Sequence, residues 1–249
     1  GFGSRISEYS HLVPKPMIEI GGKPILCHIM NIYSHFGYND FIVCAGYKQE
    51  VIKRFFSEYY LRTSDVTFDF RNNNNVIFHR NRAEPWKVTI VDTGLNTMTG
   101  GRIRRIEPFL GGDEEFMLTY GDAVSDVDID KLLEFHKASN SRITLTAVQP
   151  GGRFGALDIN FDGTVKQFAE KNKASGGWIN AGFMVANTDI ISLIDGDDCV
   201  FEQTPLELLS ARGDLKAYKH SGFWQCMDTL KERNYLDQLC NLNQAPWIR

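Results

Sequence analysis

The sequence GFGSR at residues 1–5, followed by PKP at residues 14–16, decides the interpretation of the whole chain. Glycines let backbone N–H groups approach phosphate oxygens closely, as they do in other loops that bind phosphate. Arg5 and Lys15 would bring positive charge to the same anion. The pattern therefore predicts a nucleoside triphosphate site in this part of the chain.

A phosphate-binding loop of this kind normally follows a buried strand. Here no apolar segment stands ahead of the loop. Residues 1–4 alone would usually be interpreted as a frayed terminus or the remnant of a tag, but the proline-flanked Lys15 and the acidic residues further on favour the loop. We therefore expect that a short first strand is missing before residue 1.

Length and composition narrow the functional classes. The chain has 249 residues, enough for one large α/β domain or two small ones. Its net charge of −4 argues against general nucleic-acid binding, for which a basic surface is usual. No apolar run approaches the roughly 18 residues of a membrane span. The five cysteines form neither a CxxC pair nor a zinc-binding spacing, so we expect reduced and mostly buried thiols.

Helix and strand patterns alternate along the chain. Apolar residues at helical spacing predict helices at residues 24–36, 49–61, 129–138 and 229–241, with Asp128 as a cap of the third. Short apolar runs predict strands at residues 40–45, 88–91, 115–120, 143–148, 154–159, 165–168 and 181–185. This alternation favours an α/β fold. We expect a Rossmann-like, mostly parallel sheet with helices on both faces and a small embedded antiparallel layer.

Two aspartates are candidate metal ligands. Asp122 follows the predicted strand at 115–120 and Gly121, so it would sit at the carboxyl edge of the sheet, where ligands gather in open α/β folds. Asp228 follows an aromatic stretch late in the chain. Each has a simpler interpretation, Asp122 as a turn residue and Asp228 as the cap of the last helix. Together they could hold one Mg²⁺ against phosphate oxygens, with water completing the shell.

Four residues in the second half of the chain are candidates for sugar recognition. Glu170 and Lys171 follow the predicted strand at 165–168 and could contact sugar hydroxyls and a sugar phosphate, although a charged pair at a strand end is usually solvated. Asn180 could bond sugar hydroxyls or simply begin a strand. Gly155 could let a sugar ring approach closely or merely mark a bulge.

The segment TMTGGR at residues 97–102 is a candidate base site. Gly100 and Gly101 would let the backbone pass close to a planar base. Arg102 could donate to both O2 and N3 of cytosine, whereas uracil and thymine carry a hydrogen on N3 and would lose one of these bonds. The alternative is a solvated arginine in a basic run.

Taken together, these residues resemble the sugar-phosphate nucleotidyltransferases, whose signature is a GxGxR loop with a downstream PKP. The closer resemblance is to the glucose-1-phosphate cytidylyltransferases, and it spans nearly the whole chain. The segments that carry it are PKPMIEIGGKPIL (14–26), SDVTFD (64–69), EPW (84–86), VDTG (91–94), MTGGR (98–102), RFGALDI (153–159), GFWQ (222–225) and APW (245–247).

The resemblance implies a role for each candidate residue. The implied catalytic residues are Arg5, Lys15 and Asp122, and the implied metal ligands are Asp122 and Asp228. The implied sugar-phosphate site consists of Gly155, Glu170, Lys171 and Asn180. The implied nucleotide-binding residues are Gly1, Phe2, Gly3, Ser4, Arg5, Lys15, Thr97, Gly100, Arg102 and Gly121.

The resemblance also implies a reaction, in which CTP and α-D-glucose 1-phosphate give CDP-glucose and pyrophosphate with Mg²⁺ as cofactor. A uridylyl- or thymidylyltransferase acting on the same sugar is one alternative. A non-catalytic sugar-nucleotide-binding regulatory protein is another, because a fold does not fix a function. The implied enzyme is cytoplasmic and homo-oligomeric, binds neither nucleic acid nor membrane, and serves dideoxysugar synthesis for the O-antigen of lipopolysaccharide.

We expect a single nucleotidyltransferase domain over residues 1–249, because neither a linker nor an internal repeat interrupts the chain. Residues 1–125 would form its nucleotide-binding half and residues 126–228 its sugar-binding half. A C-terminal helix would follow at residues 229–249. The asparagine run at residues 72–75 is expected in a surface turn.

Overall fold

The computed structural model describes residues 6, 9, 11–149 and 177–248, together with the backbone of residues 156–159 and 165–169. Its α-helices are α2 (Ile25–Ser34), α3 (Gln49–Ser57), α4 (Tyr59–Thr63), α5 (Thr99–Arg105), α6 (Ile129–Ser139), α7 (Thr204–Arg212) and α8 (Leu230–Asn241). Short 3₁₀ turns are η2 (Lys15–Met17), η3 (Glu107–Phe109) and η5 (Thr188–Leu193). Within the described ranges, no helix combines the length and the apolar character needed to cross a bilayer.

The strands of the first half are β1 (Glu19–Ile20), β2 (Lys23–Pro24), β3 (Asp40–Ala45), β4 (Ser64–Asp69), β5 (Asn75–Asn81), β6 (Lys87–Asp92), β7 (Glu115–Leu118) and β8 (Ala123–Ser125). Those of the second half are β9 (Ile143–Val148), β10 (Ala156–Ile159), β11 (Val165–Ala169), β12 (Ile179–Asn180), β13 (Met184–Asn187), β14 (Leu215–Lys219) and β15 (Trp224–Cys226). The strands predicted at residues 40–45 and 143–148 are thus confirmed with the same bounds as β3 and β9.

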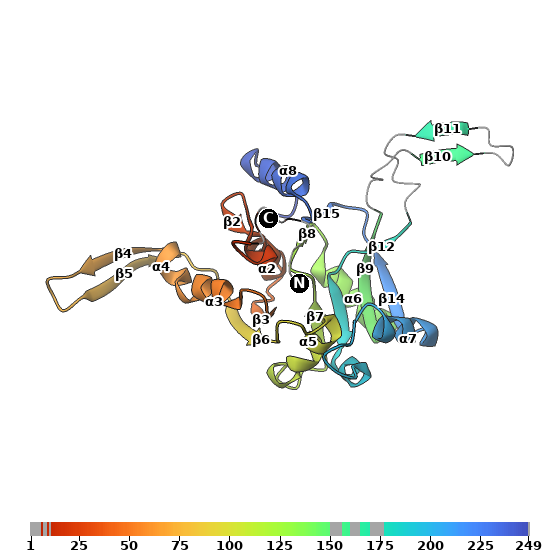
Figure 1. The fold of residues 1–249 in the computed structure, drawn as a ribbon, viewed down its shortest axis with the longest axis horizontal. Helices are drawn as coiled ribbons and strands as arrows, with labels where there is room; N and C mark the ends of the chain where they lie inside the picture. Colours follow the sequence, from red (N-terminus) through yellow and green to blue (C-terminus); the bar gives the residue numbers. More distant parts are fainter. Residues whose placement is uncertain are drawn as a thin grey trace.

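The largest sheet is organised around β9. Strand β14 pairs with β9 in parallel, whereas β12 and β13 pair with it antiparallel, and β13 also pairs antiparallel with β7 (Figure 1). Strands β3 and β6 form a parallel pair over the full length of both. The α/β fold class is confirmed. Among the strands that the structure describes, the β3–β6 and β9–β14 pairs are parallel and the other pairs, including β10 with β11, are antiparallel, so the pairing is mixed rather than mostly parallel.

Helix α2 carries the apolar face that its sequence predicts. Ile25, Ile29 and Ile32 are buried and belong to one core cluster with Val124 of β8 and Leu236 of α8. The burial of these side chains fixes α2 against β8, because apolar surface removed from water stabilises the contact by roughly 25 cal/mol per Å². This core packs against β8, the strand that begins directly after Asp122.

Two predicted elements differ from the structure. The helix predicted at residues 49–61 is two helices, because Glu58 leaves the helical conformation with φ −103° and ψ 3°. The strand predicted at residues 181–185 begins later, at Met184, because Gly182 and Phe183 have positive φ values of 75° and 47°. Such values cannot continue an extended strand.

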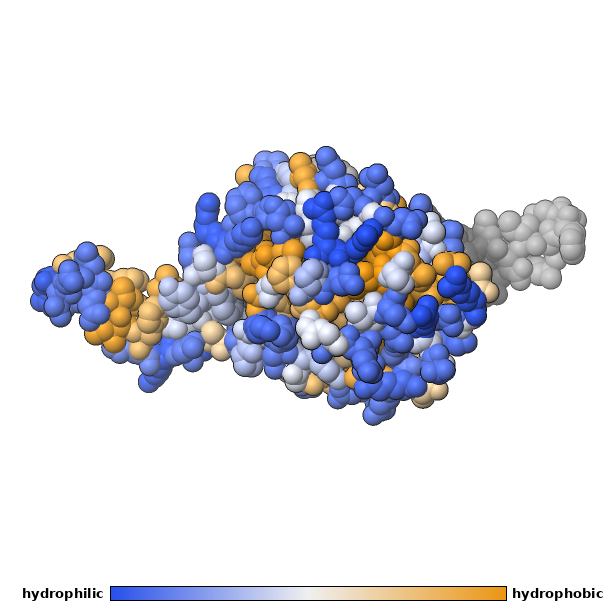
Figure 2. Space-filling model, turned by 90° about the horizontal axis from the view of Figure 1, so that it is seen from below, coloured by the Kyte–Doolittle hydropathy of each residue, from blue (hydrophilic) through white to orange (hydrophobic). Residues whose placement is uncertain are grey.

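Strands β4 and β5 form an antiparallel hairpin that projects away from the body of the molecule (Figure 1). Every residue of β5 is exposed, and apolar side chains gather along the hairpin (Figure 2). Asn73 and Asn74 adopt positive φ at its tip, which confirms the predicted surface turn. The exposed large apolar residues of this arm are Phe68, Phe70, Val76, Ile77 and Phe78.

Candidate active site

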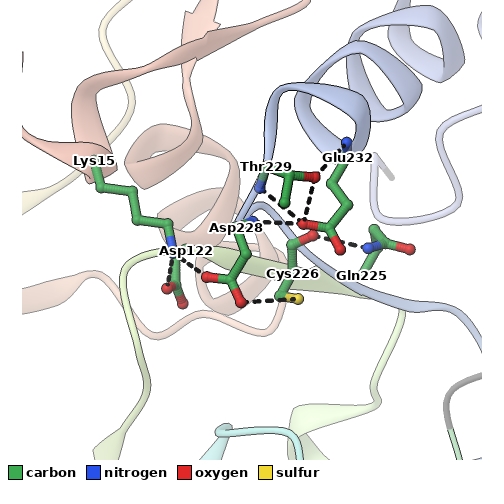
Figure 3. Close-up of polar contacts among 7 residues, drawn as sticks. All are labelled: Lys15, Asp122, Gln225, Cys226, Asp228, Thr229 and Glu232. Atoms are coloured by element: carbon green, nitrogen blue, oxygen red, sulfur yellow. Dashed lines mark hydrogen bonds and ion pairs between the residues drawn. The ribbon is translucent and has the colours of Figure 1, made fainter. Parts of the chain in front are cut away.

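The ammonium group of Lys15 lies between two carboxylates. Its Nζ donates to Asp122 Oδ2 and to Asp228 Oδ1, each at 2.6 Å (Figure 3). All three side chains are largely buried, with exposed fractions of 15% for Lys15, 31% for Asp122 and 19% for Asp228. The structure therefore brings together two of the three predicted catalytic residues, Lys15 and Asp122, and both candidate metal ligands, Asp122 and Asp228.

Strand pairing positions the two carboxylates. Cys226 of β15 pairs with Ala123 of β8 in the antiparallel register. The backbone N–H of Met227 donates to the carbonyl of Asp122 at 2.8 Å and extends this pairing by one step. Asp122 and Asp228 thus emerge side by side from the same end of a two-stranded ladder.

Helix α8 holds the backbone of Asp228. Its N-cap is Thr229, so the simpler interpretation of Asp228 as the helix cap is wrong. The side chain of Glu232 forms a capping box with Thr229 and accepts the backbone N–H of Asp228 at 2.8 Å (Figure 3). The Asp228 carboxylate is left to point toward Lys15.

The electrostatics of this cluster favour the charged forms. Burial alone would lower the pKa of Lys15, but the charges of Asp122 and Asp228 and their hydrogen bonds outweigh it, so the pKa lies above its usual range. Cys226 lies beside the cluster, with its Sγ 4.0 Å from Asp228 Oδ2. Burial, helped by nearby carboxylates, raises the pKa of this thiol to about 11, so it stays protonated near neutral pH.

Gly121 explains how the PKP segment fits against the site. A Cβ atom on Gly121 would lie 2.9 Å from Cγ of Pro16, so a larger residue would push η2 away. Pro14 precedes this turn with φ −67° and ψ 148°. The two prolines thus fix the backbone on both sides of Lys15, and the glycine allows it to approach Asp122.

Arg102 lies apart from these contacts, at the carboxyl ends of β3 and β6. Its Nη1 donates to Thr93 Oγ1 at 2.6 Å and to the carbonyl of Ala45 at 3.3 Å, and its Nη2 donates to the carbonyl of Leu95 at 3.3 Å. Burial lowers its pKa from the usual value for arginine. The interpretation of Arg102 as a solvated surface residue is therefore wrong.

Glycine in the candidate base segment lets this segment pack closely against the backbone near Cys199. A Cβ atom on Gly100 would lie 2.8 Å from the carbonyl oxygen of Cys199, whose backbone also accepts the Gly100 N–H at 2.9 Å. Thr97 is 8% exposed. A Cβ atom on Gly94 would meet its Oγ1 at 2.6 Å. The loop between β6 and α5 is thus tightly held by its own turn and by the segment near Cys199.

Asn180 belongs to a contact that the sequence does not signal. Its Nδ2 donates to the hydroxyl of Tyr120 at 3.3 Å, and its Oδ1 accepts the N–H of Gly182 at 3.0 Å. The Tyr120 hydroxyl donates in turn to Glu202. Glu202 lies between the buried Phe201 and the start of α7, and no spacing or motif distinguishes it in the sequence from a surface acid.

The remaining candidates lie outside the described residues: Gly1, Phe2, Gly3, Ser4, Arg5, Gly155, Glu170 and Lys171. In the part of the chain that the structure describes, no group of three or more His, Cys, Asp or Glu side chains is placed to hold a metal ion.

Comparisons with known proteins point in one direction. The nucleotidyl transferase family profile matches residues 1–200. The chain is 52% identical over 247 residues to the glucose-1-phosphate cytidylyltransferase of Salmonella typhimurium, covering 99% of this chain and 95% of that protein. It is 38% identical over 248 residues to a probable glucose-1-phosphate cytidylyltransferase of Bacillus subtilis, covering 99% of this chain and 96% of that protein.

Solved structures agree on the fold. An apo UDP-glucose pyrophosphorylase matches with a TM-score of 0.68 at 13% identity, covering 98% of this chain and 96% of that chain. At this level of identity the likeness establishes the fold alone. The site has to be argued from the residues of this chain.

Proposed function

The chain belongs to the nucleotidyl transferase family, and from this membership we propose that it transfers the cytidylyl group of CTP to α-D-glucose 1-phosphate. The products are CDP-glucose and pyrophosphate. The 52% identity to a glucose-1-phosphate cytidylyltransferase over 99% of the chain supports the substrates. The observation that carries the mechanism is the convergence of Asp122 and Asp228 on the Lys15 ammonium.

The reaction is a phosphoryl substitution. An oxygen of the sugar phosphate attacks the α-phosphorus of CTP in line and forms a new P–O bond. The bond from that phosphorus to the oxygen bridging to the β-phosphate breaks, and its electron pair leaves with pyrophosphate. The attacking phosphate is already ionised near neutral pH, so no general base is needed. Catalysis then consists of positioning and charge neutralisation.

The carboxylate pair fits a hard divalent cation. Mg²⁺ is typically bound through one or two carboxylates, with phosphate oxygens and water completing the shell. Asp122 and Asp228 already share one cationic group, the Lys15 ammonium. We therefore assign Mg²⁺ to these two carboxylates, where it would neutralise charge on the phosphates. Lys15 would then donate to the α-phosphate.

The other candidates keep the roles that the resemblance assigns. Arg5 and the loop at residues 1–4 would hold the departing pyrophosphate through backbone N–H groups. Lys171 would bind the sugar phosphate. The residues proposed to contact the glucose ring are Gly155, Glu170 and Asn180.

Base selection is proposed to rest on Thr97 and Arg102. A guanidinium group carries five N–H donors. Three hydrogen bonds to Thr93, Ala45 and Leu95 are made within the described residues. The donors that remain can serve O2 and N3 of cytosine, while the three protein contacts keep the group oriented.

We also propose a homo-oligomer in the cytoplasm. The projecting hairpin supports self-association, because it exposes a continuous apolar surface that a monomer would leave in water (Figure 2). A second copy of the chain is the occupant that this surface would take. The implied product, CDP-glucose, would feed dideoxysugar synthesis.

The decisive experiment measures pyrophosphate release from glucose 1-phosphate with CTP, UTP, dTTP, ATP and GTP, with and without Mg²⁺. Mg²⁺-dependent release with CTP alone is expected. Preference for another triphosphate would keep the chemistry and overturn the base assignment. Binding of CDP-glucose without any release would identify a regulatory protein instead.

Two variants test the assigned residues. Asp122→Asn should raise the Mg²⁺ concentration needed for half-maximal turnover, and an unchanged requirement would remove Asp122 from the metal site.

Arg102→Lys keeps the charge but loses the planar fork, so the rate ratio of CTP to UTP should fall. An unchanged ratio would refute base reading by Arg102.

A further inference from the structure

A carboxylate joins the two halves of the candidate site. Oε2 of Glu202 accepts the hydroxyl of Thr99 at 2.6 Å, and Oε1 accepts the hydroxyl of Tyr120 at 2.7 Å. Glu202 follows Phe201, which is buried in the core with 1% exposure. The carboxylate is therefore held in place by the anchored residue beside it.

The first partner belongs to the nucleotide side. Thr99 is the first residue of α5 and stands between Thr97 and Gly100 of the candidate base segment. Its hydroxyl donates to Glu202 and accepts the backbone N–H of Phe201 at 2.9 Å. Both bonds together fix one rotamer of Thr99, so the start of α5 is tied to the segment that carries Glu202.

Backbone contacts reinforce this attachment. The N–H of Met98 donates to the carbonyl of Asp197 at 2.8 Å, and the N–H of Gly100 donates to the carbonyl of Cys199 at 2.9 Å. The loop that would face the base is thus carried by the segment ending at Glu202. A displacement of Glu202 would shift that loop.

The second partner belongs to the sugar side. Tyr120 directly precedes Gly121 and Asp122. Burial and the neighbouring Glu202 raise its pKa, so the hydroxyl keeps its proton and donates it to Glu202. Its oxygen is then left to accept from Asn180 Nδ2 at 3.3 Å.

This direction of bonding orients the amide of Asn180. Its Nδ2 faces Tyr120, and its Oδ1 accepts the N–H of Gly182 at 3.0 Å. The second hydrogen on Nδ2 and the second lone pair on Oδ1 are the groups that a sugar hydroxyl would meet. The N–H of Gly182 sets which end of the amide is the oxygen, and the tyrosine hydroxyl holds the Nδ2 end in place, so without that hydroxyl Nδ2 would lose its fixed position toward the sugar.

We propose that Glu202 and Tyr120 are positioning residues that align the sugar site with the nucleotide site, a role that rests on the proposed transferase function. Tyr120 orients Asn180 toward glucose 1-phosphate, and Glu202 ties Tyr120 to Thr99 and hence to the CTP loop. Neither side chain is required to touch a reacting atom. Their effect is on the affinity for each substrate.

Steady-state kinetics of single variants test the alignment. Tyr120→Phe should raise KM for glucose 1-phosphate by about tenfold while KM for CTP changes by less than about twofold. Thr99→Val should instead raise KM for CTP by about tenfold and change KM for glucose 1-phosphate by less than about twofold. Thr99→Ser, which keeps the hydroxyl, should retain the wild-type KM values. Glu202→Ala should raise both KM values. Glu207→Ala, on the exposed face of α7, is the matched control and should change neither.

Non-additive effects of two substitutions on KM distinguish the proposed alignment from a merely structural contact. In the Tyr120→Phe/Glu202→Ala double variant, KM for glucose 1-phosphate should rise no further than in the worse single variant, because both act through one contact. A merely structural role would lower the melting temperature and the active fraction and leave both KM values unchanged. That outcome would overturn the proposal.

The same variants distinguish this inference from the proposed function. Calorimetry measures the affinity for CDP-glucose in the absence of turnover. Tyr120→Phe should weaken this affinity by about the same factor by which it raises KM for the sugar phosphate. If the wild-type protein is active and Tyr120→Phe binds CDP-glucose normally, the alignment is refuted and the transferase stands. If the wild-type protein binds CDP-glucose without turnover and Tyr120→Phe binds it more weakly, the alignment stands and the transferase is refuted. If the wild-type protein neither reacts nor binds, both are refuted.

Discussion

Lys15 is the central residue of the candidate site. Two aspartates placed side by side repel one another, and a single ammonium 2.6 Å from each relieves that repulsion. The same two carboxylates are the proposed metal ligands. Under that proposal, Lys15 and a divalent cation would compete for one pair of oxygens until a phosphate offered Lys15 another partner.

This competition can be measured directly. Lys15→Met should raise the affinity for Mn²⁺ in the absence of nucleotide by about tenfold or more, because the competing charge is gone. Electron paramagnetic resonance of free Mn²⁺ reads the binding without any turnover. Lys15→Arg, which keeps the charge, is the matched control and should stay close to the wild type. Equal affinity in all three proteins would show that Lys15 and the metal do not share the carboxylates.

His28 is a buried residue that the fold holds in its neutral form. Its Nε2 donates to the carbonyl of Ile20 at 2.9 Å, and its Nδ1 accepts the indole N–H of Trp247 at 3.2 Å. Burial, only partly offset by the bond to Ile20, lowers its pKa below the ordinary 6.5. The neutral form is thus the one that both hydrogen bonds require.

A dependence of stability on pH follows from this shift. The unfolded chain takes up a proton at His28 near pH 6.5, whereas the folded chain takes it up only at lower pH, so stability falls as pH drops below 6.5. Urea unfolding at about pH 7.5 and about pH 5.5 should show this loss in the wild type and less of it in His28→Gln. His35→Gln, a change at the exposed end of the same helix, should preserve the loss. An identical loss in His28→Gln would assign it to other groups.

At the scale of the element, α8 depends on its first turn. The hydroxyl of Thr229 accepts the N–H of Glu232 at 3.3 Å, and Oε2 of Glu232 accepts the N–H of Thr229 at 2.9 Å. Because the same carboxylate also accepts the N–H of Asp228, the end of β15 and the start of α8 form one unit.

Loss of this cap should be measurable as stability. Thr229→Ala should lower the free energy of unfolding by about 1 kcal/mol, the usual cost of removing an N-cap hydroxyl. Lys231→Ala lies on the exposed face of the same first turn and should cost less than half of that. Chemical denaturation with an unchanged m-value checks both. Equal effects would mean that the cap contributes nothing specific.

Elements could be predicted where burial imposes a period on the sequence. Strand β3 could be predicted from its apolar run and β9 from apolar residues interrupted only by two threonines. Helix α6 could be predicted from its apolar spacing and the Asp128 cap, which accepts the N–H of Lys131. The hairpin of β4 and β5 was missed because neither strand contributes a buried side chain to the core: β4 alternates only between half-buried and exposed residues, and β5 is exposed throughout. The break at Glu58 was missed because the aromatic residues on both sides continue the helical pattern.

The candidate site could be predicted only in part. Lys15, Asp122 and Asp228 were recognised by their neighbours in sequence, but their mutual contact joins positions 107 and 213 residues apart. No local pattern carries that information. Glu202 was missed for the same reason, since its two partners lie 103 and 82 residues away.

At the scale of the whole molecule, the hairpin arm is the part least explained by a single copy. An isolated two-stranded ribbon is marginally stable in water. Phe68 and Val76 are cross-strand partners on one face, with 52% and 41% of their surfaces exposed. Phe70 stacks beside Phe68 with 79% exposure. Burial of this face against a second copy would supply the missing stabilisation.

Light scattering coupled to gel filtration tests this association. The wild type should elute at a multiple of the 28.3 kDa chain mass. Phe68→Lys/Val76→Glu replaces the apolar pair by opposite charges, which keeps the cross-strand pairing favourable while removing the apolar face, and should shift the mass toward the monomer. Asn72→Glu adds charge at the tip alone and should leave the mass unchanged. A monomeric wild type would refute the homo-oligomer.

The distribution of the three clustered residues along the chain has a consequence for synthesis on the ribosome. Lys15 emerges early, Asp122 near the middle and Asp228 only shortly before α8. A chain that ends before β15 would contain Lys15 and Asp122 but would lack the ladder partner of β8 and the second carboxylate. Truncated products should therefore be unable to hold a cation and a nucleotide together. Under the proposed function, the complete site would form only after β15 and Asp228 have been synthesised.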